Sequence, residues 1–289
     1  LVTGHDHLGH GGSIRTKADY GYFAEPDGNR AVLADLHAMT MRTKELYPDV
    51  PYFLLGHSMG SFYARQYLCE YGRELDGAII MGTGFQPKAL VQFAKTTCRV
   101  LAAFHGWHYR SKLVANLSFL GYNKGLEGRT THDWLNRDAA EVDKYLADER
   151  CTFTFTLNAY YSMFSGILRL HDPAFLAQMP KDLPLLFLAG DADPVGEQGK
   201  GVRRASSTPV PATNCWWKRT TRKYSKTSAT GWKSSFPADA CIPASLSCHP
   251  LRMAGFFASF WHFFAFGGFA GRTAFCECLS CFLPFRRLD

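Results

Sequence analysis

The stretch YFLLGHSMGSFYAR, residues 52–65, decides the fold of this 289-residue chain. Its first four residues form an apolar run that is too short for a helix, so they predict a buried strand. The run leads into the pattern Gly-x-Ser-x-Gly, and residues 59–71 then favour a helix that ends at Gly72. A strand, a glycine-bounded turn and a helix in this order would make Ser58 project from the turn.

The same alternation of strands and helices continues on both sides of this stretch. Apolar residues at helical spacing predict a helix over 28–47, and two further apolar runs, 75–82 and 183–190, predict buried strands. Residues 88–178 are mostly helical in pattern. Buried strands separated by helices are typical of a mostly parallel sheet with helices on both faces, so the expected fold class is α/β.

Ser58 is the candidate catalytic nucleophile. A serine hydroxyl is a weak nucleophile at neutral pH, and it needs a base within hydrogen-bond reach together with donors for the oxyanion. After a strand–turn–helix, the backbone N–H of Met59 would point at the oxyanion, and the positive end of the helix dipole would favour its charge. The alternative is that Ser58 is an ordinary turn serine.

Three motifs follow one another along the chain: Asp6–Ser13 (DHLGHGGS), Gly56–Ser61 (GHSMGS) and Leu188–Val195 (LAGDADPV). In this order they resemble the upstream loop, the nucleophile elbow and the acid loop of the α/β-hydrolase superfamily, in its monoacylglycerol lipase and lysophospholipase-like branch (serine aminopeptidase S33 type). The resemblance covers residues 1 to about 204. It implies an α/β-hydrolase fold with a helical cap and a carboxylic ester hydrolase that forms an acyl-serine intermediate. The implied substrate is a small lipid ester, a lysophospholipid or a monoacylglycerol.

The resemblance also implies where the acid and the cap lie. Its pattern G-x-x-D places the triad acid at Asp193, whereas Asp191 could cap a turn. The hydrolase core would comprise residues 1–85 and 179–204, and residues 86–178 would form the helical cap insert. Six residues of the cap either line an acyl-chain pocket or simply pack the helices together. They are Tyr160, Tyr161, Met163, Phe164, Ile167 and Leu168.

The catalytic histidine that the resemblance implies is missing. It should follow the acid by roughly 30–35 residues, but the sequence at 223–228 is KYSKTS. His57 adjoins the nucleophile with its side chain directed away, and it is interpreted as structural. His249 and His262 lie in the C-terminal tail and are poor candidates. The histidines of the upstream loop would have a structural or oxyanion-side role: His5, His7 and His10. No general base is therefore identified.

Residues 205–289 differ in composition from the rest of the chain. They hold ten of the 32 Lys and Arg, three of the 25 Asp and Glu, and six of the nine Cys, so they carry the whole net charge of +7. The remaining body is neutral and offers no basic groove, and no nucleic-acid partner is expected. Its three widely spaced cysteines suit a reducing cytosol, so the expected location is cytoplasmic.

A shifted reading frame would explain this tail. Asn214–Lys218 (NCWWK) must be encoded AAY-TGY-TGG-TGG-AAR, and reading from the third base of each codon gives Leu-Leu-Val-Glu, a strand-like run. Permitted codons for residues 228–235 give Arg-His-Gly-Val-Glu-Val in the same frame, with a histidine at the required spacing. We therefore hypothesise a frameshift near residue 205, and 205–289 would be an aberrant tail rather than a folded domain. The rival is a genuine C-terminal extension, and the DNA around codon 205 decides between them.

Two other features of the tail are weak signals. The CxxC spacing of Cys278 and Cys281 has no second ligand pair after it, so no zinc site is expected, and no other metal or cofactor is expected. The apolar stretch 253–271 has the length of a bilayer span but is rich in glycine and bulky phenylalanine, and a true span is not expected. A transient contact with a membrane surface is instead the expected route to a lipid substrate.

The chain begins at Leu1 without a methionine, and we expect an N-terminal truncation that removes the first strands and the early oxyanion loop of the family. The sheet would then be incomplete. As written, the chain is expected to be inactive because it lacks the catalytic histidine. The alternatives are an S33-type aminopeptidase, of the proline-iminopeptidase kind, and a non-catalytic α/β-hydrolase-like binding protein. The oligomeric state is unknown.

Overall fold

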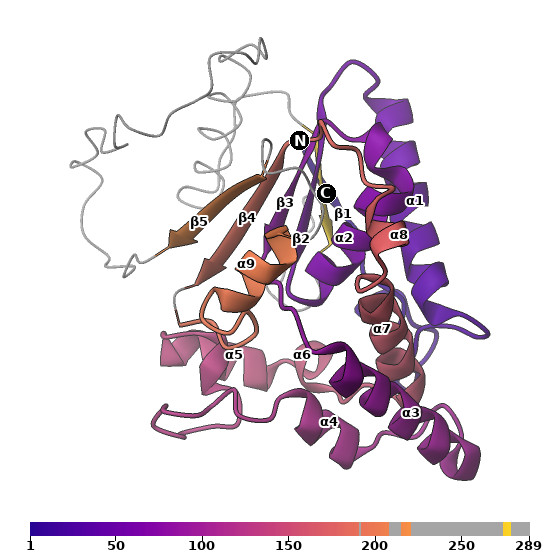
Figure 1. The fold of residues 1–289 in the computed structure, drawn as a ribbon. Helices are drawn as coiled ribbons and strands as arrows, with labels where there is room; N and C mark the ends of the chain where they lie inside the picture. The colour runs from indigo at the N-terminus through magenta and orange to yellow at the C-terminus, as the bar shows by residue number, and fades with distance from the viewer. Residues whose placement is uncertain (191, 208–214, 221–273, 279–289) are drawn as a thin grey trace. The chain divides into compact units, whose positions relative to one another are not determined.

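The computed structural model describes residues 1–190, 192–207, 215–220 and 274–278 (Figure 1). The chain divides into two compact units. One of them, Leu1 with Thr221–Thr273, falls almost entirely outside the described residues. Everything below concerns the other, which comprises Val2–Thr220 and Ala274–Asp289.

A parallel sheet forms the centre of this unit. Its strands are β1 (Val2–Gly4), β2 (Tyr52–His57), β3 (Gly77–Met81), β4 (Leu185–Gly190), β5 (Cys215–Thr220) and β6 (Ala274–Cys278). Among the described residues they lie in the order β1-β6-β2-β3-β4-β5, and every neighbouring pair is parallel. The three strands expected from the apolar runs are therefore confirmed as β2, β3 and β4, and so is the α/β fold class.

The helices also follow the sequence pattern. The α-helices are α1 (Gly28–Leu46), α2 (Met59–Tyr71), α3 (Lys88–His105), α4 (Lys112–Ser118), α5 (Ala139–Ala147), α6 (Glu149–Thr152), α7 (Leu157–Arg169), α8 (Pro173–Leu176) and α9 (Lys200–Ser207). Short 3₁₀ helices are η1 (Lys17–Asp19), η2 (Gly72–Glu74) and η3 (Asp133–Leu135). The two helices expected over 28–47 and 59–71 are confirmed as α1 and α2.

Two strands come from the region in which the sequence analysis expects none. β5 pairs with β4 from Leu185 to Gly190, and β6 lies between β1 and β2. Tryptophan, threonine and phenylalanine in these two segments favour strands. β5 pairs with the backbone groups along the edge of β4 that β3 leaves unoccupied, whereas β6 pairs with β1 on one side and β2 on the other. The frame hypothesis and the tail boundary are not tested by these strands, because most of residues 205–289, the stretch 253–271 included, lies outside the described residues.

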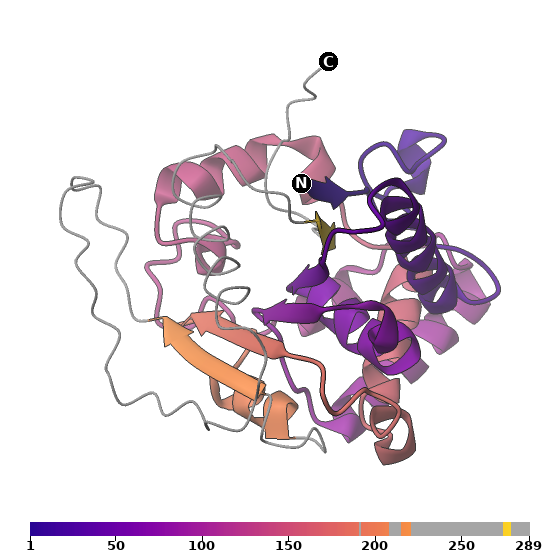
Figure 2. The same cartoon turned by 90° about the horizontal axis from the view of Figure 1, so that it is seen from above.

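The helices form layers around the sheet. α2 packs on β2 and β3, while α9 lies beside β4 and β5 (Figure 2). Helices α3 to α6 gather beyond the end of the sheet to which the arrowheads of β4 and β5 point (Figure 1). Within the described part of the chain, no helix has both the length and the apolar character that a bilayer span requires.

The helix α7 packs on α3 and also on α1 and α2. Asn158, near its first turn, accepts a hydrogen bond from the Phe23 amide at 3.1 Å and donates to the Ala24 carbonyl at 2.9 Å. Further along, Gly166 lies against a buried pair of amides, Asn29 of α1 and Gln66 of α2, which bond to each other at 2.9 and 3.3 Å. Three helices therefore meet around one pair of amides, and the pair leaves no room for a side chain at residue 166.

We expect Gly166→Ala to destabilise the protein by roughly 2–4 kcal/mol. A Cβ at this position would lie 2.2 Å from Asn29 Oδ1 and 2.4 Å from Gln66 Nε2, so the buried amide pair must separate. Alanine is otherwise the better helix former by about 1 kcal/mol, and the clash reverses the sign. Urea unfolding measures the difference. Ser165→Ala, on the same helix, is the control, and equal stability of the two variants would contradict this reading.

Candidate active site

The turn between β2 and α2 has the geometry of a nucleophile elbow. Ser58 has φ +50° and ψ −118°, a conformation that an L-residue rarely adopts. Such a backbone costs about 1–3 kcal/mol and is kept only where its surroundings enforce it. A residue at this position lies outside the helix and directly before its first turn, so Ser58 is not a serine of a continuous helix. The sequence-based expectation of a sharp strand–turn–helix is met.

The glycine that precedes the turn is required by close packing. A Cβ added to Gly56 would lie 2.5 Å from the Gly60 carbonyl oxygen and 2.6 Å from the Ala64 Cβ. Strand β2 and helix α2 therefore approach each other more closely than any side chain at residue 56 would allow. The close approach directs the chain back over the strand and fixes the position of residue 58.

Backbone hydrogen bonds hold the elbow in place on its neighbour. The Ser58 amide donates to the Met81 carbonyl at the end of β3, at 3.0 Å, and the Ser61 hydroxyl donates to the Ser58 carbonyl at 2.5 Å. Met59 is the first residue of α2, so its N–H is one of the amides that a helix leaves without an intrahelical acceptor. An oxyanion at Ser58 would meet this amide and the positive end of the helix dipole.

The candidate acid lies at the end of another strand. Asp193 follows β4 and is largely enclosed: its carboxylate accepts hydrogen bonds from the amides of Val195, at 2.9 Å to Oδ1, and Gly196. Burial raises the pKa of Asp193 above its usual value, and the two amide hydrogen bonds oppose that rise. The alternative acid, Asp191, lies outside the described residues.

Gly82 brings the acid close to the histidine of the elbow. A Cβ at this residue, whose φ is +57°, would lie 3.2 Å from His57 Nε2 and 3.5 Å from Asp193 Oδ2. The His57 ring thus extends to the same spot as the acid, at the carboxyl ends of β2, β3 and β4. Burial lowers the pKa of His57, so the neutral imidazole is favoured there.

The upstream histidines form a buried ring cluster rather than a base. His7 is 1% exposed and its ring lies 5.2 Å from that of His5, 6.4 Å from that of His10 and 5.9 Å from that of Tyr63. His10 Nδ1 lies 3.0 Å from the Leu8 carbonyl, which suits an N–H at that nitrogen. These contacts support the structural role.

No described histidine hydrogen-bonds to Ser58 or Asp193. His249 and His262 fall outside the described residues. The structure therefore brings the nucleophile and the acid to one edge of the sheet without assigning a base. Within the described ranges, no group of His, Cys, Asp and Glu has the geometry of a metal site.

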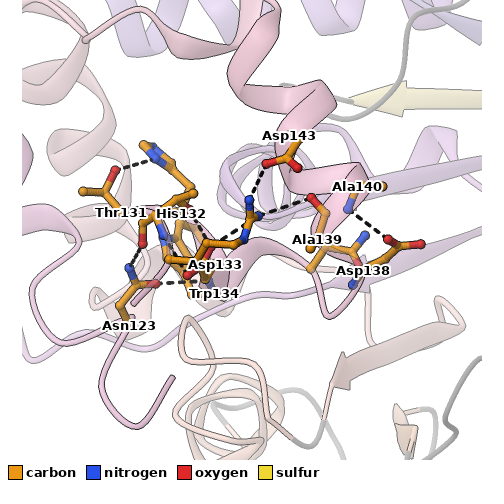
Figure 3. Close-up of polar contacts among 12 residues, drawn as sticks. Asn123, Thr131, His132, Asp133, Trp134, Asp138, Ala139, Ala140 and Asp143 are labelled. Carbon is orange, nitrogen blue, oxygen red and sulfur yellow. Dashed lines mark hydrogen bonds and ion pairs between the residues drawn. The ribbon is translucent and has the colours of Figure 1, made fainter. Parts of the chain in front are cut away.

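Sequence reasoning missed one polar group near the acid, Tyr122, which lies between α4 and η3. Burial, and secondarily the charge of Asp193, raises the pKa of the Tyr122 phenol. Its ring packs on Trp134 at 4.9 Å and on Phe119 at 5.8 Å. The neighbouring residue, Asn123, donates to the Thr130 carbonyl and accepts from the Trp134 amide (Figure 3). The cluster of aromatic residues in 119–134 was the sequence feature that could have pointed to Tyr122.

Charged contacts join this segment to α5. Arg129 donates to Asp143 Oδ1 at 2.5 Å and to the Ala139 carbonyl at 3.3 Å, which ties the segment before η3 to helix α5 (Figure 3). Asp133 accepts hydrogen bonds from the amide and the hydroxyl of Thr130. The segment that carries Tyr122 is thus folded by bonds of its own.

The six residues that were expected either to line an acyl-chain pocket or to pack helices together mostly pack helices. Tyr160, Phe164 and Ile167 are buried in the main core, and Tyr161, Met163 and Leu168 are partly buried against it. Tyr161 accepts a hydrogen bond from Arg99 at 2.8 Å. The packing interpretation accounts for these contacts.

Comparison with known proteins agrees with this geometry. A family model described as serine aminopeptidase, S33, matches residues 1–215. The chain belongs to this family. The mouse (Mus musculus) monoglyceride lipase is 32% identical over 205 residues, which cover 67% of this chain and 56% of that protein. The chain thus spans little more than half the length of this relative.

Solved structures show the same architecture. A thermostable carboxyl esterase from Bacillus coagulans superposes on this S33 family member with a TM-score of 0.66 and 26% identity, covering 74% of this chain and 69% of that one. A lipase in its open form gives a TM-score of 0.64 at 22% identity, covering 74% and 70%. These likenesses confirm the α/β-hydrolase fold.

We expect this family member to lose stability as the pH falls below about 6.5. Burial lowers the pKa values of His5, His7 and His10 in the folded protein. As the pH falls, the unfolded chain therefore binds protons before the folded protein does, and acid stabilises the unfolded state. The stability is present above the unfolded pKa and is lost as the pH falls toward the folded one.

The His10→Gln variant measures this effect. Its unfolding free energy, from urea titrations between pH 5 and 7.5, should depend on pH less steeply than that of the parent, by up to about 1.4 kcal/mol per pH unit. His105→Gln replaces an exposed histidine and serves as control. An unchanged slope in His10→Gln would show that this histidine is not kept neutral by the fold.

Proposed function

We propose that the chain derives from a serine hydrolase that cleaves carboxylic esters through an acyl-Ser58 intermediate. The observation that carries the proposal is the left-handed backbone of Ser58 between β2 and α2, because strain of this kind persists where a hydroxyl must be exposed at a helix N-terminus. Membership of the S33 family and the similarity to monoglyceride lipase support it.

Each residue has a role in the proposed reaction. Ser58 Oγ would attack the ester carbonyl, and the Met59 amide would bind the resulting oxyanion. Asp193 would orient the imidazole that takes the serine proton and returns it to the leaving alcohol. Water would then release the acid by the same path. Because no described histidine occupies the place of that imidazole, we propose that the chain as written has negligible activity.

The proposed substrate is a lipid ester, a monoacylglycerol or a lysophospholipid. The name of the mouse relative, monoglyceride lipase, supports the first of these. The second candidate function is an aminopeptidase, which the description of the family supports. A cytoplasmic location stays a prediction from the cysteine pattern.

A fluorophosphonate probe tests the proposed nucleophile and the missing base. We expect labelling of the 289-residue chain to be slower, by about 10³-fold or more, than labelling of a version in which the reading frame is restored from codon 205. In the restored version, Ser58→Ala should abolish labelling and Asp193→Asn should slow it by about 10³–10⁴-fold. Asp182→Asn, at an exposed acid before β4, is the matched control.

The outcomes of this experiment separate the parts of the proposal. Efficient labelling of Ser58 in the 289-residue chain would show that it contains a base. Labelling that survives Ser58→Ala would refute the nucleophile. Rates for monoacylglycerol, lysophospholipid and aminoacyl amide substrates on the restored version then distinguish an esterase from a peptidase.

We also propose that the cap contacts a membrane surface from which a lipid substrate is taken. Residues 86–126 contain six Lys and Arg and no Asp or Glu. One face of α3 and the segment around α4 expose large apolar side chains, among which Phe104 is 81% and Leu120 75% exposed. The others are Leu90, Phe93, Val100, Leu113, Leu117 and Phe119. Exposed apolar groups among cations suit an anionic bilayer surface.

Sedimentation with lipid vesicles tests this contact. We expect the protein to bind vesicles that contain about 30% anionic lipid more tightly than neutral ones, by roughly tenfold or more. The double variant Phe104→Ser, Leu120→Ser should lose most of this binding. Met41→Ser, Leu46→Ser removes exposed apolar side chains from α1 instead and should bind as the parent does. Equal binding by both double variants would contradict the proposed surface.

A further inference from the structure

A guanidinium group is buried two helical turns after the candidate nucleophile. Arg65 of α2 is 4% exposed, and its Nη1 donates to the Gly84 carbonyl at 3.2 Å and lies 3.5 Å from the Thr83 hydroxyl. No described carboxylate lies within salt-bridge distance of it. Burial lowers the pKa of Arg65 to about 10.

A buried charge without a partner charge lowers the stability of the folded protein. Removing an ion from water costs several kcal/mol, and an ion pair offsets this only when a partner charge is present. The neighbours of Arg65 along α2 are buried, and an apolar residue there would fill the space without that cost. The two acceptors of Arg65 belong to one segment, residues 83–84, so its effect is to hold this segment against α2.

This segment is the surface on which the acid loop rests. A Cβ at Gly84 would lie 2.7 Å from the Val195 carbonyl oxygen, and one at Gly196 would lie 3.1 Å from the Thr83 carbonyl oxygen. The two loops therefore approach each other backbone to backbone at these two glycines, with the Gln86 and Val202 side chains packed beside the contacts. A displacement of residues 83–84 has to be followed by residues 195–196.

The acid loop in turn fixes the candidate acid. The amides of Val195 and Gly196 both donate to the Asp193 carboxylate. A continuous series of contacts thus runs from Arg65 through residues 83–84 and 195–196 to the carboxylate. The same β3–α3 segment begins at Gly82, which separates His57 from Asp193.

We propose that Arg65 is a positioning residue for Asp193: by holding Thr83 and Gly84 against α2, it fixes the backbone amides that orient the carboxylate. The functional meaning of this role rests on the proposed function of Asp193 as the triad acid. Arg65 itself does not touch the reacting atoms.

The test uses Arg65→Met, which keeps much of the side-chain volume and removes the donors, and Arg65→Lys, which keeps the charge and removes the planar fork. Gln66→Met is the matched control. Gln66 is the next residue of α2, equally buried, but it bonds to Asn29 and the Phe62 carbonyl on another side of the helix. All three variants lose buried hydrogen bonds, whereas only the Arg65 variants lose the hold on the acid loop.

Two readouts report on the acid without any catalysis. The first is the pKa of Asp193 from its carboxyl carbon resonance, assigned with Asp193→Asn. In Arg65→Met the Val195 and Gly196 amides are held less firmly on the carboxylate, and their hydrogen bonds are what lowers this pKa. The pKa should therefore rise further, by about half a unit or more. The second is hydrogen exchange of the Val195 and Gly196 amides, which should become at least about tenfold faster. Gln66→Met should leave both readouts as in the parent.

The proposal is overturned if Arg65→Met and Arg65→Lys leave the Asp193 pKa and the two amide exchange rates the same as in Gln66→Met. If Arg65→Met does not fold, Arg65→Lys decides by the same two measurements, because it retains the charge. Since neither readout needs a turnover, an absence of esterase activity in the frame-restored version would refute the proposed function and leave this result standing.

Discussion

The close approach of β2 and α2 is the constraint on which the site depends. Without a side chain at Gly56, the strand and the helix lie so near each other that the connecting turn has room for one residue in a left-handed conformation. The buried strands β2 and β3 and the apolar face of α2 supply the stability that offsets the strain at Ser58. A serine exposed at a helix N-terminus is therefore a product of the packing beneath it.

Parallel strands then bring the other groups to the same edge. In the registered sheet, His57 lies opposite Met81, and Met81 opposite Leu188, so the loops that follow β2, β3 and β4 start at one level. The candidate nucleophile and acid come from the first and the third of these loops, and Gly82 of the middle loop lies beside both His57 and Asp193. Their placement follows from register and needs no contact between the two side chains themselves.

Much of this could be predicted from sequence because the signals are local. The helix over 59–71 was predicted with the bounds that it has, since a glycine turn precedes it and Gly72 follows it. Asp193 was selected as the candidate acid by the G-x-x-D pattern of the family resemblance, and it lies in the loop that follows β4. The contacts of Arg65 with residues 83–84 and the nearness of Tyr122 to Asp193 could not be predicted, because they join residues that are apart in the chain. β5 and β6 were not expected, because their unusual composition outweighed their strand-favouring residues.

The segment that carries Tyr122 is held together by contacts among its own residues. Its hydrogen bonds and ion pairs join Asn123, Arg129 and Asp133 to residues no farther along than Asp143. A movement of this segment relative to the sheet would leave those bonds intact, because each joins two residues of the same part of the chain. It would also take the Tyr122 phenol away from the charge of Asp193, and the pKa of that phenol would then fall toward its usual value.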